Sequence, residues 1–105
     1  MNGSYDAGSG TYRITLIESF DFGSHQDFRA KIKEAVDNKS SQLVLDFAPV
    51  DYMDSAALGM LMLARSEMEK ISGTVILDNV HGYVEKVLTM VKFNELFTVN
   101  KKASA

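Results

Sequence analysis

Hydrophobic residues recur along the chain with two different spacings, which predict two kinds of element. From Tyr12 to Leu16 every second residue is hydrophobic, a pattern that favours a strand with one wetter face. Short apolar runs at 43–47 and 74–78 are typical of strands covered on both faces. Residues 96–99 form a further apolar run. We therefore predict four strands, with the last at Leu96–Val99.

Helical spacing of apolar residues predicts three helices between these strands. The first begins at Ser24, where an aspartate three positions later resembles a capping box. The second covers 54–71, and Gly73 is expected to supply the left-handed conformation that closes it. The third lies near 84–91, with Asn94 as its left-handed residue. Each helix thus carries its own start or stop signal.

Strands that alternate with helices imply parallel pairing through right-handed crossovers. We expect an α/β domain with a mixed, mostly parallel sheet of about four to five strands and about three helices. Residues 11–100 would form this single domain. The glycine-rich residues 1–10 would be flexible or form a short edge strand, antiparallel to the rest. Residues 101–105 would be a tail.

Composition narrows the class of protein. The chain has 105 residues, of which 46% are hydrophobic and 24% charged, as in ordinary globular domains. Cysteine is absent, which excludes disulfide scaffolds, thiolate metal sites and a cysteine nucleophile. No apolar stretch is long enough to span a membrane, and the first residues lack the features of a secretory signal. We expect a cytoplasmic protein that does not insert into a membrane.

The net charge of −3 comes from one segment. Residues 40–64 contain no lysine or arginine but hold Asp46, Asp51 and Asp54, while the other acids and bases balance. Each aspartate alone is readily explained as a turn or cap residue. Together they argue against nucleic acid as a partner, because phosphate recognition needs clustered basic residues.

The segment from Val50 to Ala64 joins a predicted strand to a helix that is apolar on more than one side. Such a helix is either buried on most sides or presents an apolar patch to a partner, and the pattern leaves both open. Asp54 and Ser55 are both good N-caps, so Ser55 could simply satisfy a backbone amide. The same position could instead expose its hydroxyl, and a phosphate there would meet free amides and the positive end of the helix.

Residues 54–59, Asp-Ser-Ala-Ala-Leu-Gly, resemble the phosphorylation loop of the STAS domain family, which is named for sulfate transporters and anti-sigma factor antagonists. The resemblance extends over roughly Tyr12–Val99. It implies a STAS fold of the bacterial anti-sigma factor antagonist type. In those antagonists a partner serine kinase phosphorylates the serine that matches Ser55 and a metal-dependent phosphatase removes the phosphate. Only the unphosphorylated form binds the kinase or anti-sigma factor tightly.

The resemblance therefore predicts a phosphorylation-controlled protein switch, without a cofactor or metal of its own and as a monomer. The phosphorylation site would be Ser55. The predicted contacts with the serine kinase or anti-sigma factor are Asp51, Tyr52, Met53, Asp54, Ser55, Ala56, Ala57, Gly59, Met60 and Leu63. ATP and magnesium would belong to the kinase, and the output would be partner switching in signal transduction or transcription regulation.

Two other functions stay open. The chain could be an accessory subunit of a membrane transporter complex that binds the transporter's ATPase without a phosphorylation switch, as some small STAS proteins do. It could also be an enzyme that uses Asp46 and Asp78 at the strand ends, where α/β proteins place catalytic groups. The residues around these aspartates in sequence supply no lysine or arginine for a transferred phosphate, so we expect no enzyme. His25 and His81 lack the close spacing of metal motifs.

Overall fold

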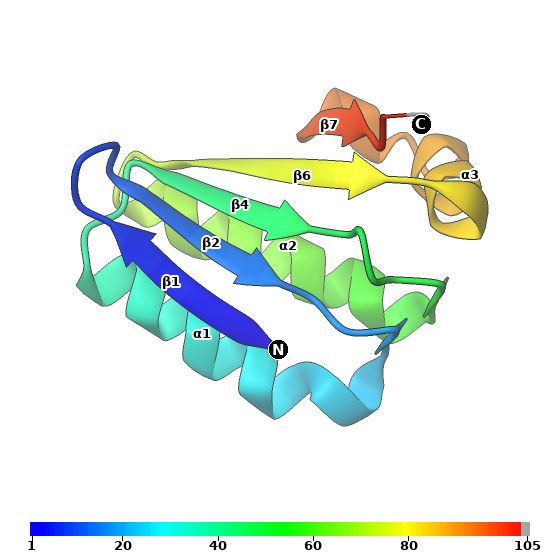
Figure 1. The fold of residues 1–105 in the computed structure, drawn as a ribbon, viewed down its shortest axis with the longest axis horizontal. Coiled ribbons are helices and arrows are strands. Elements are labelled where there is room, and N and C mark those ends of the chain that lie inside the picture. The colour runs from blue at the N-terminus through cyan, green and yellow to red at the C-terminus, as the bar shows by residue number, and fades with distance from the viewer. Residues whose placement is uncertain (104–105) are drawn as a thin grey trace.

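The computed structural model describes residues 1–103 and shows a five-stranded sheet with three α-helices (Figure 1). In spatial order the strands are β1 (Asn2–Asp6), β2 (Thr11–Thr15), β4 (Gln42–Asp46), β6 (Thr74–Val80) and β7 (Thr98–Lys101). Strand β1 is antiparallel to β2, and the other neighbours are parallel. This confirms the predicted α/β class with a mixed, mostly parallel sheet.

Helices α1 (His25–Asp37) and α2 (Ser55–Lys70) cover one face of the sheet, and α3 (Gly82–Met90) lies at the end toward which the parallel strands point (Figure 1). Alternation along β2 explains this arrangement, because Tyr12 and Ile14 are buried toward the helices while Arg13 is half-buried on the other face. The core therefore fills the layer between the sheet and α1 and α2.

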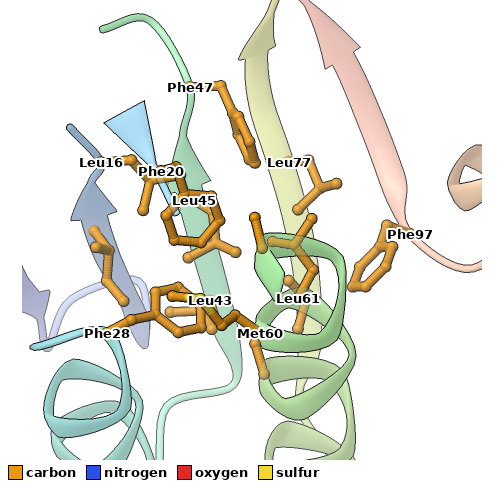
Figure 2. Close-up of a cluster of buried hydrophobic side chains, with 14 of the residues drawn as sticks. Leu16, Phe20, Phe28, Leu43, Leu45, Phe47, Met60, Leu61, Leu77 and Phe97 are labelled. Atoms are coloured by element: carbon orange, nitrogen blue, oxygen red, sulfur yellow. The ribbon is translucent and has the colours of Figure 1, made fainter. Parts of the chain in front are cut away.

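The side chains of this core come from β2, β4, β6 and the α-helices, together with the segments that connect them, and Figure 2 shows part of this cluster. Leu43, Leu45 and Leu77 on the central strands are fully buried, but they lie at alternate positions. Ile76 beside Leu77 is only half-buried. Strand β6 is therefore not covered equally on both faces, contrary to the prediction from its continuous apolar run, because α1 and α2 lie on one face of the sheet (Figure 1). Phe20 and Phe28 pack with ring centroids 5.2 Å apart, which ties the segment before α1 to the helix itself. The first turns of α2 pack on the same core through Ala57, Met60 and Leu61.

Two short elements beside the main sheet have no sequence signal. Strands β3 (Ser19–Phe20) and β5 (Tyr52–Met53) pair in parallel and lie just before η1 (Phe22–Ser24) and α2 respectively. A two-residue strand is too short to show a period of two, so no pattern indicated them. Their pairing brings residue 22 close to the start of α2.

The first helix is not capped as predicted. Ser24 precedes α1 but makes no side-chain capping bond, and its hydroxyl instead donates to the backbone oxygen of Asp21 at 2.8 Å. The carboxylate of Asp21 accepts from the amide of Gly23 and so caps the short helix η1. The 3-10 turn ahead of α1 therefore takes over the polar groups that a capping box would have used.

The predicted left-handed residues after α2 and α3 are also displaced. Ser72, rather than Gly73, has a positive φ of 59°, and Lys92, rather than Asn94, has a φ of 61°. The last strand begins at Thr98 because η2 (Phe93–Glu95) follows α3 and delays it. These corrections move element ends and leave the order of elements unchanged.

Strands lie near both ends of the described residues, 1–103. Residues 2–6 form an exposed edge strand, one of the two forms expected for the N-terminal segment. Lys101 still lies in β7, and the amide of Lys102 donates to Val80 O at 2.9 Å. The rest of the predicted tail, 104–105, lies outside the described residues. Within residues 1–103, no helix is both long and apolar enough to cross a membrane.

Candidate functional site

Ser55 is the first residue of α2, at the end of the sheet where the loops after β2, β4 and β6 gather (Figure 1). Its side chain is exposed. Asp54, and not Ser55, makes the N-cap bond of α2, and no side-chain hydrogen bond within residues 1–103 involves the Ser55 hydroxyl. The structure therefore excludes the explanation that Ser55 is present as the N-cap of α2, because Asp54 caps this helix.

Asp54 joins two elements at this point. Its Oδ1 accepts from the amide of Ala57 at 3.0 Å, which is the N-cap bond of α2. Its Oδ2 accepts from the amide of Phe22 at 3.2 Å. One carboxylate thus caps the helix and fastens the turn of η1 beside it, and the position of Ser55 relative to Phe22 follows from this bridge.

The amides of Ser55 and Ala56 lie in the first turn of α2, where backbone N–H groups have no partner within the helix. No acceptor reaches them from any described residue up to position 103. The positive end of the helix therefore has two donors available close to the Ser55 hydroxyl. This arrangement can accommodate an anion attached to Ser55, which is the chemistry that serine phosphorylation requires.

An exposed stripe continues from Ser55 along α2. Gly59 lies one turn further, followed by Met62 and Ser66, and all four residues are exposed. A Cβ placed on Gly59 would find no atom within 4 Å apart from its chain neighbours and the adjacent backbone of α2. Because the stripe has small side chains near Ser55 and a thioether beyond them, it offers a partly apolar surface that another protein could approach closely.

The predicted contact residues divide by burial. Asp51, Tyr52, Ser55 and Gly59 are exposed, and Asp54, Ala56 and Leu63 are half-buried. Three others lie in the core with little or no exposed surface: Met53, Ala57 and Met60. The burial of these three residues corrects their prediction as contact residues, because only the exposed and half-buried residues are accessible at the surface.

Aromatic residues near Ser55 were missed from the sequence. Phe22 is 62% exposed and stacks on the His25 ring with centroids 4.4 Å apart. Tyr83, at the start of α3, is 54% exposed and stacks on Tyr52 with an interplanar angle of 3°. The nearest sequence signals are the glycines beside them, Gly23 and Gly82, which mark the two rings as close to connecting segments, and connecting segments run over the surface.

Asp46 and Asp78, considered above as catalytic candidates, are held in a different arrangement. Arg13 on β2 lies 2.9 Å from Asp46 Oδ2 and 3.3 Å from Asp78 Oδ2. This corrects the expectation that no basic group lies near these carboxylates, because strand pairing brings residue 13 beside residues distant in sequence. No group of three or more potential metal ligands occurs within residues 1–103.

The hydrogen bonds of Asp46 explain its titration and its structural role. Burial acts to raise the pKa of Asp46, but bonds from Asn79, the Ala48 amide and Arg13 outweigh it and lower the pKa. The Ala48 amide lies 2.9 Å from Oδ1 and begins the loop that leads to Ser55. Asp46 therefore stabilises the base of that loop as a carboxylate.

Sequence comparison with known proteins shows the family of this chain. The STAS domain family model matches residues 7–105. A STAS-domain containing protein of Pseudomonas aeruginosa (strain UCBPP-PA14) is 38% identical over 83% of this chain and 85% of its own length. A protein of Bordetella bronchiseptica (strain ATCC BAA-588 / NCTC 13252 / RB50), named as a candidate anti-sigma factor antagonist, BtrV, is 25% identical over 76% of this chain and 69% of its own length.

Solved structures share the fold at lower identity. The unphosphorylated anti-sigma factor antagonist SpoIIAA superposes with a TM-score of 0.72 at 23% identity, over 98% of this chain and 88% of that one. The phosphorylated form of SpoIIAA from Bacillus gives a TM-score of 0.69 at 22% identity, over 93% of this chain and 90% of that one. The murine solute carrier 26 family member A9 anion transporter gives 0.74 at 23% identity, over 90% of this chain and 17% of the transporter.

Proposed function

Because the chain belongs to the STAS domain family, we propose that it acts as an anti-sigma factor antagonist-like switch that phosphorylation of Ser55 controls. In this proposal the unphosphorylated protein binds a serine kinase of the anti-sigma factor type. The kinase transfers phosphate from its own ATP to the Ser55 hydroxyl, and a metal-dependent serine phosphatase restores the free form. The chain itself supplies a binding surface.

The observation that carries the proposal is the exposed Ser55 hydroxyl, which has no hydrogen-bond partner in the described chain and stands beside the open surface of Gly59. A serine that served only the fold would be expected to bond a backbone group, as Ser40 does with Ala35 O at 2.8 Å. The names of the SpoIIAA structures, which include a phosphorylated form, support the same chemistry in a protein of this fold.

The charges around Ser55 give the physical basis of the switch. Phosphorylation adds about −1.5 to −2 charge units, next to Asp54 and close to the exposed Asp51. The free amides of the first turn of α2 stabilise the phosphate locally, so the domain stays folded. A partner packed against Gly59 would have to desolvate the phosphate, and the penalty for an unpaired buried charge is about 2–5 kcal/mol.

Phosphorylation of the purified chain by candidate serine kinases from the same genome tests the proposal. We expect mass spectrometry to locate a single phosphate on Ser55 and the phosphorylated protein to lose affinity for that kinase. Ser55→Ala should abolish phosphorylation and keep binding. Ser66→Ala is the matched control for the phosphorylation, because Ser66 is another exposed serine on α2, and it should leave the phosphate on Ser55. A phosphate mapped to another residue would contradict the proposal.

A second function is favoured by one observation, the structural similarity to a domain of an anion transporter. In this alternative the chain docks on a membrane transporter complex and binds its ATPase through the same surface, without modification of Ser55. Affinity purification from the native cells separates the two functions. Recovery of a transporter ATPase, with no phosphate on Ser55 under any growth condition, would favour the accessory role.

The arrangement around Arg13 supports a binding role rather than catalysis. Asp46 and Asp78 share one guanidinium, and Asp46 also accepts from Asn79 Nδ2 at 3.0 Å. Such charge-assisted hydrogen bonds link the C-terminal parts of β4 and β6 to β2. We expect the isolated chain to hydrolyse neither ATP nor phosphate esters, and magnesium to leave its thermal unfolding unchanged. Magnesium-dependent stabilisation that is lost in Asp46→Asn would overturn this part of the proposal.

A further inference from the structure

A group of exposed aromatic rings extends beyond the predicted site, and we call it the aromatic patch: Phe22, Tyr52 and Tyr83. Of the three, only Tyr52 is among the predicted contacts. Each ring is between 48% and 62% exposed. Phe22 is tied to Asp54 through its amide, and Tyr52 lies three positions before Ser55. Three large rings with this much exposed surface beside one helix end are more than the scattered apolar residues that a surface normally carries.

The rings are held in place before any partner binds. Phe22 stacks on His25, whose Nδ1 lies 2.8 Å from Phe22 O, and Tyr52 stacks on Tyr83 with centroids 6.4 Å apart. Tyr52 faces outward because the next residue, Met53, is buried and successive strand residues point to opposite sides. Aromatic side chains fixed in this way lose little conformational entropy on binding, which makes them effective anchors.

The charge around the patch indicates the chemistry of the partner. Asp51 and Glu18 are exposed, and they lie close together because the Asp51 amide donates to Glu18 O at 2.9 Å. Neither side chain forms an ion pair with any residue of 1–103. Residues 40–64 contribute no positive charge. A surface with rings and unpaired carboxylates attracts guanidinium and ammonium groups through both charge and cation–π contact.

We propose that the aromatic patch anchors the protein that recognises unphosphorylated Ser55, and that this partner presents apolar sockets rimmed by arginine or lysine. The inference rests on the proposed function and extends its contact surface from the Ser55 loop to η1 and α3. The basic groups pair with Asp51 and Glu18 at the rim, whereas Ser55 and Gly59 occupy the closely packed centre. A phosphate on Ser55 therefore enters the part of the interface that holds no compensating cation.

The test uses the serine kinase that mass spectrometry shows to phosphorylate Ser55, with its binding to this chain measured by surface plasmon resonance. Phe22→Ala, Tyr52→Ala and Tyr83→Ala should each weaken binding about 10-fold or more, whereas Tyr83→Phe should retain affinity. Met90→Ala is the matched control, because Met90 is a 76% exposed apolar residue on the same helix as Tyr83. The association rate should fall as salt rises, and Asp51→Asn should flatten that dependence.

Each outcome bears on one of the two proposals. Unchanged affinity of all three alanine variants for a kinase that phosphorylates Ser55 would overturn this inference and leave the proposed function standing. An association rate that is independent of salt would overturn the basic rim. Failure of every candidate kinase to phosphorylate Ser55 would overturn the proposed function and this inference together. Circular dichroism of each variant shows that the loss of affinity is not a loss of folding.

Discussion

Two glycines in and after α2 stand in opposite surroundings. A Cβ on Gly73, just beyond the helix, would lie 2.5 Å from Met68 Cε and 3.1 Å from Ser40 O, both in buried residues. A Cβ on Gly59, in the second turn, would meet nothing within 4 Å apart from its chain neighbours and the adjacent backbone of α2. The protein's own packing requires the first glycine but does not explain the second. The C-terminal end of α2 therefore serves the fold, and its N-terminal end has room for contact with another molecule.

Gly73→Ala tests the C-terminal end of α2, which we call the sealed end because a Cβ at residue 73 has no space. This variant should lose the most stability. The added methyl group has to displace the buried Met68 side chain or the backbone at Ser40, and overpacking of this kind destabilises a protein by about 1–3 kcal/mol. Urea denaturation followed by circular dichroism measures the change. Because residue 73 lies far along the helix from Ser55, kinase binding by the folded variant should not change. A variant as stable as the wild type would show that this end is not sealed.

Asp54→Ala tests the N-terminal end of α2, which we call the open end because it has room for contact with another molecule. Urea denaturation again measures the change in stability. The substitution removes the N-cap bond to Ala57 and the bond to the Phe22 amide. Loss of an N-cap destabilises by about 0.5–2 kcal/mol, so we expect a smaller effect than at Gly73. Asp54→Asn keeps a side-chain acceptor and should recover most of the stability. If Asp54→Ala left both stability and the affinity for the kinase unchanged, the bridge between η1 and α2 would not organise the site.

Gly59→Ala should separate stability from binding. Alanine is favoured over glycine in a helix by about 0.5–1 kcal/mol, and nothing near residue 59 opposes it, so the free protein should become more stable by up to that amount. The same methyl group should weaken binding of the kinase, which is the reverse of what a change in stability alone would produce. Equal affinity of the variant and the wild type would mean that no partner approaches Gly59 closely.

The contrast between the two glycines also shows what could be predicted from the sequence. Apolar spacing located the central strands and three helices, since each buries one face and repeats with its own period. It could not distinguish Met60 from Met62, because α2 has apolar residues on several sides and only the packing shows that Met60 is buried and Met62 is 37% exposed. The left-handed residues were misplaced because Gly73 is needed for space and not for its φ.

For the candidate site, local chemistry and family resemblance together predicted Ser55, whereas the exposed rings of Phe22 and Tyr83 required the structure. An aspartate followed by a serine before an apolar helix indicates an N-terminus from the sequence alone. Phe22 and Tyr83 are far from Ser55 in sequence and reach it through the β3 and β5 pairing and through α3. Whether a ring faces the core or the solvent depends on such tertiary contacts.

Acidification should destabilise the loop that leads to the N-terminal end of α2 before it affects the region around Gly73 at the other end. We expect this effect on stability to be the smallest of the four. The loop before Ser55 is held by Asp46, whose pKa the bonds from Asn79, Ala48 and Arg13 lower despite burial, whereas the contacts of Gly73 include no titratable group. A lowered folded-state pKa stabilises the protein above the unfolded-state pKa, which is about 3.9 for aspartate, and this stabilisation disappears as the pH falls through the folded-state value.

The amide of Ala48, which donates to Asp46, should report the titration in NMR spectra with a midpoint below about 4. Its hydrogen-exchange protection should be lost at a higher pH than that of Gly73, whose amide donates to Met68 O at 2.8 Å. Asp46→Asn should abolish the pH dependence at Ala48 and leave Gly73 unaffected. Simultaneous loss of protection at both amides would mean that the two ends of the helix unfold as one unit, and that the open end is no less stable than the sealed one.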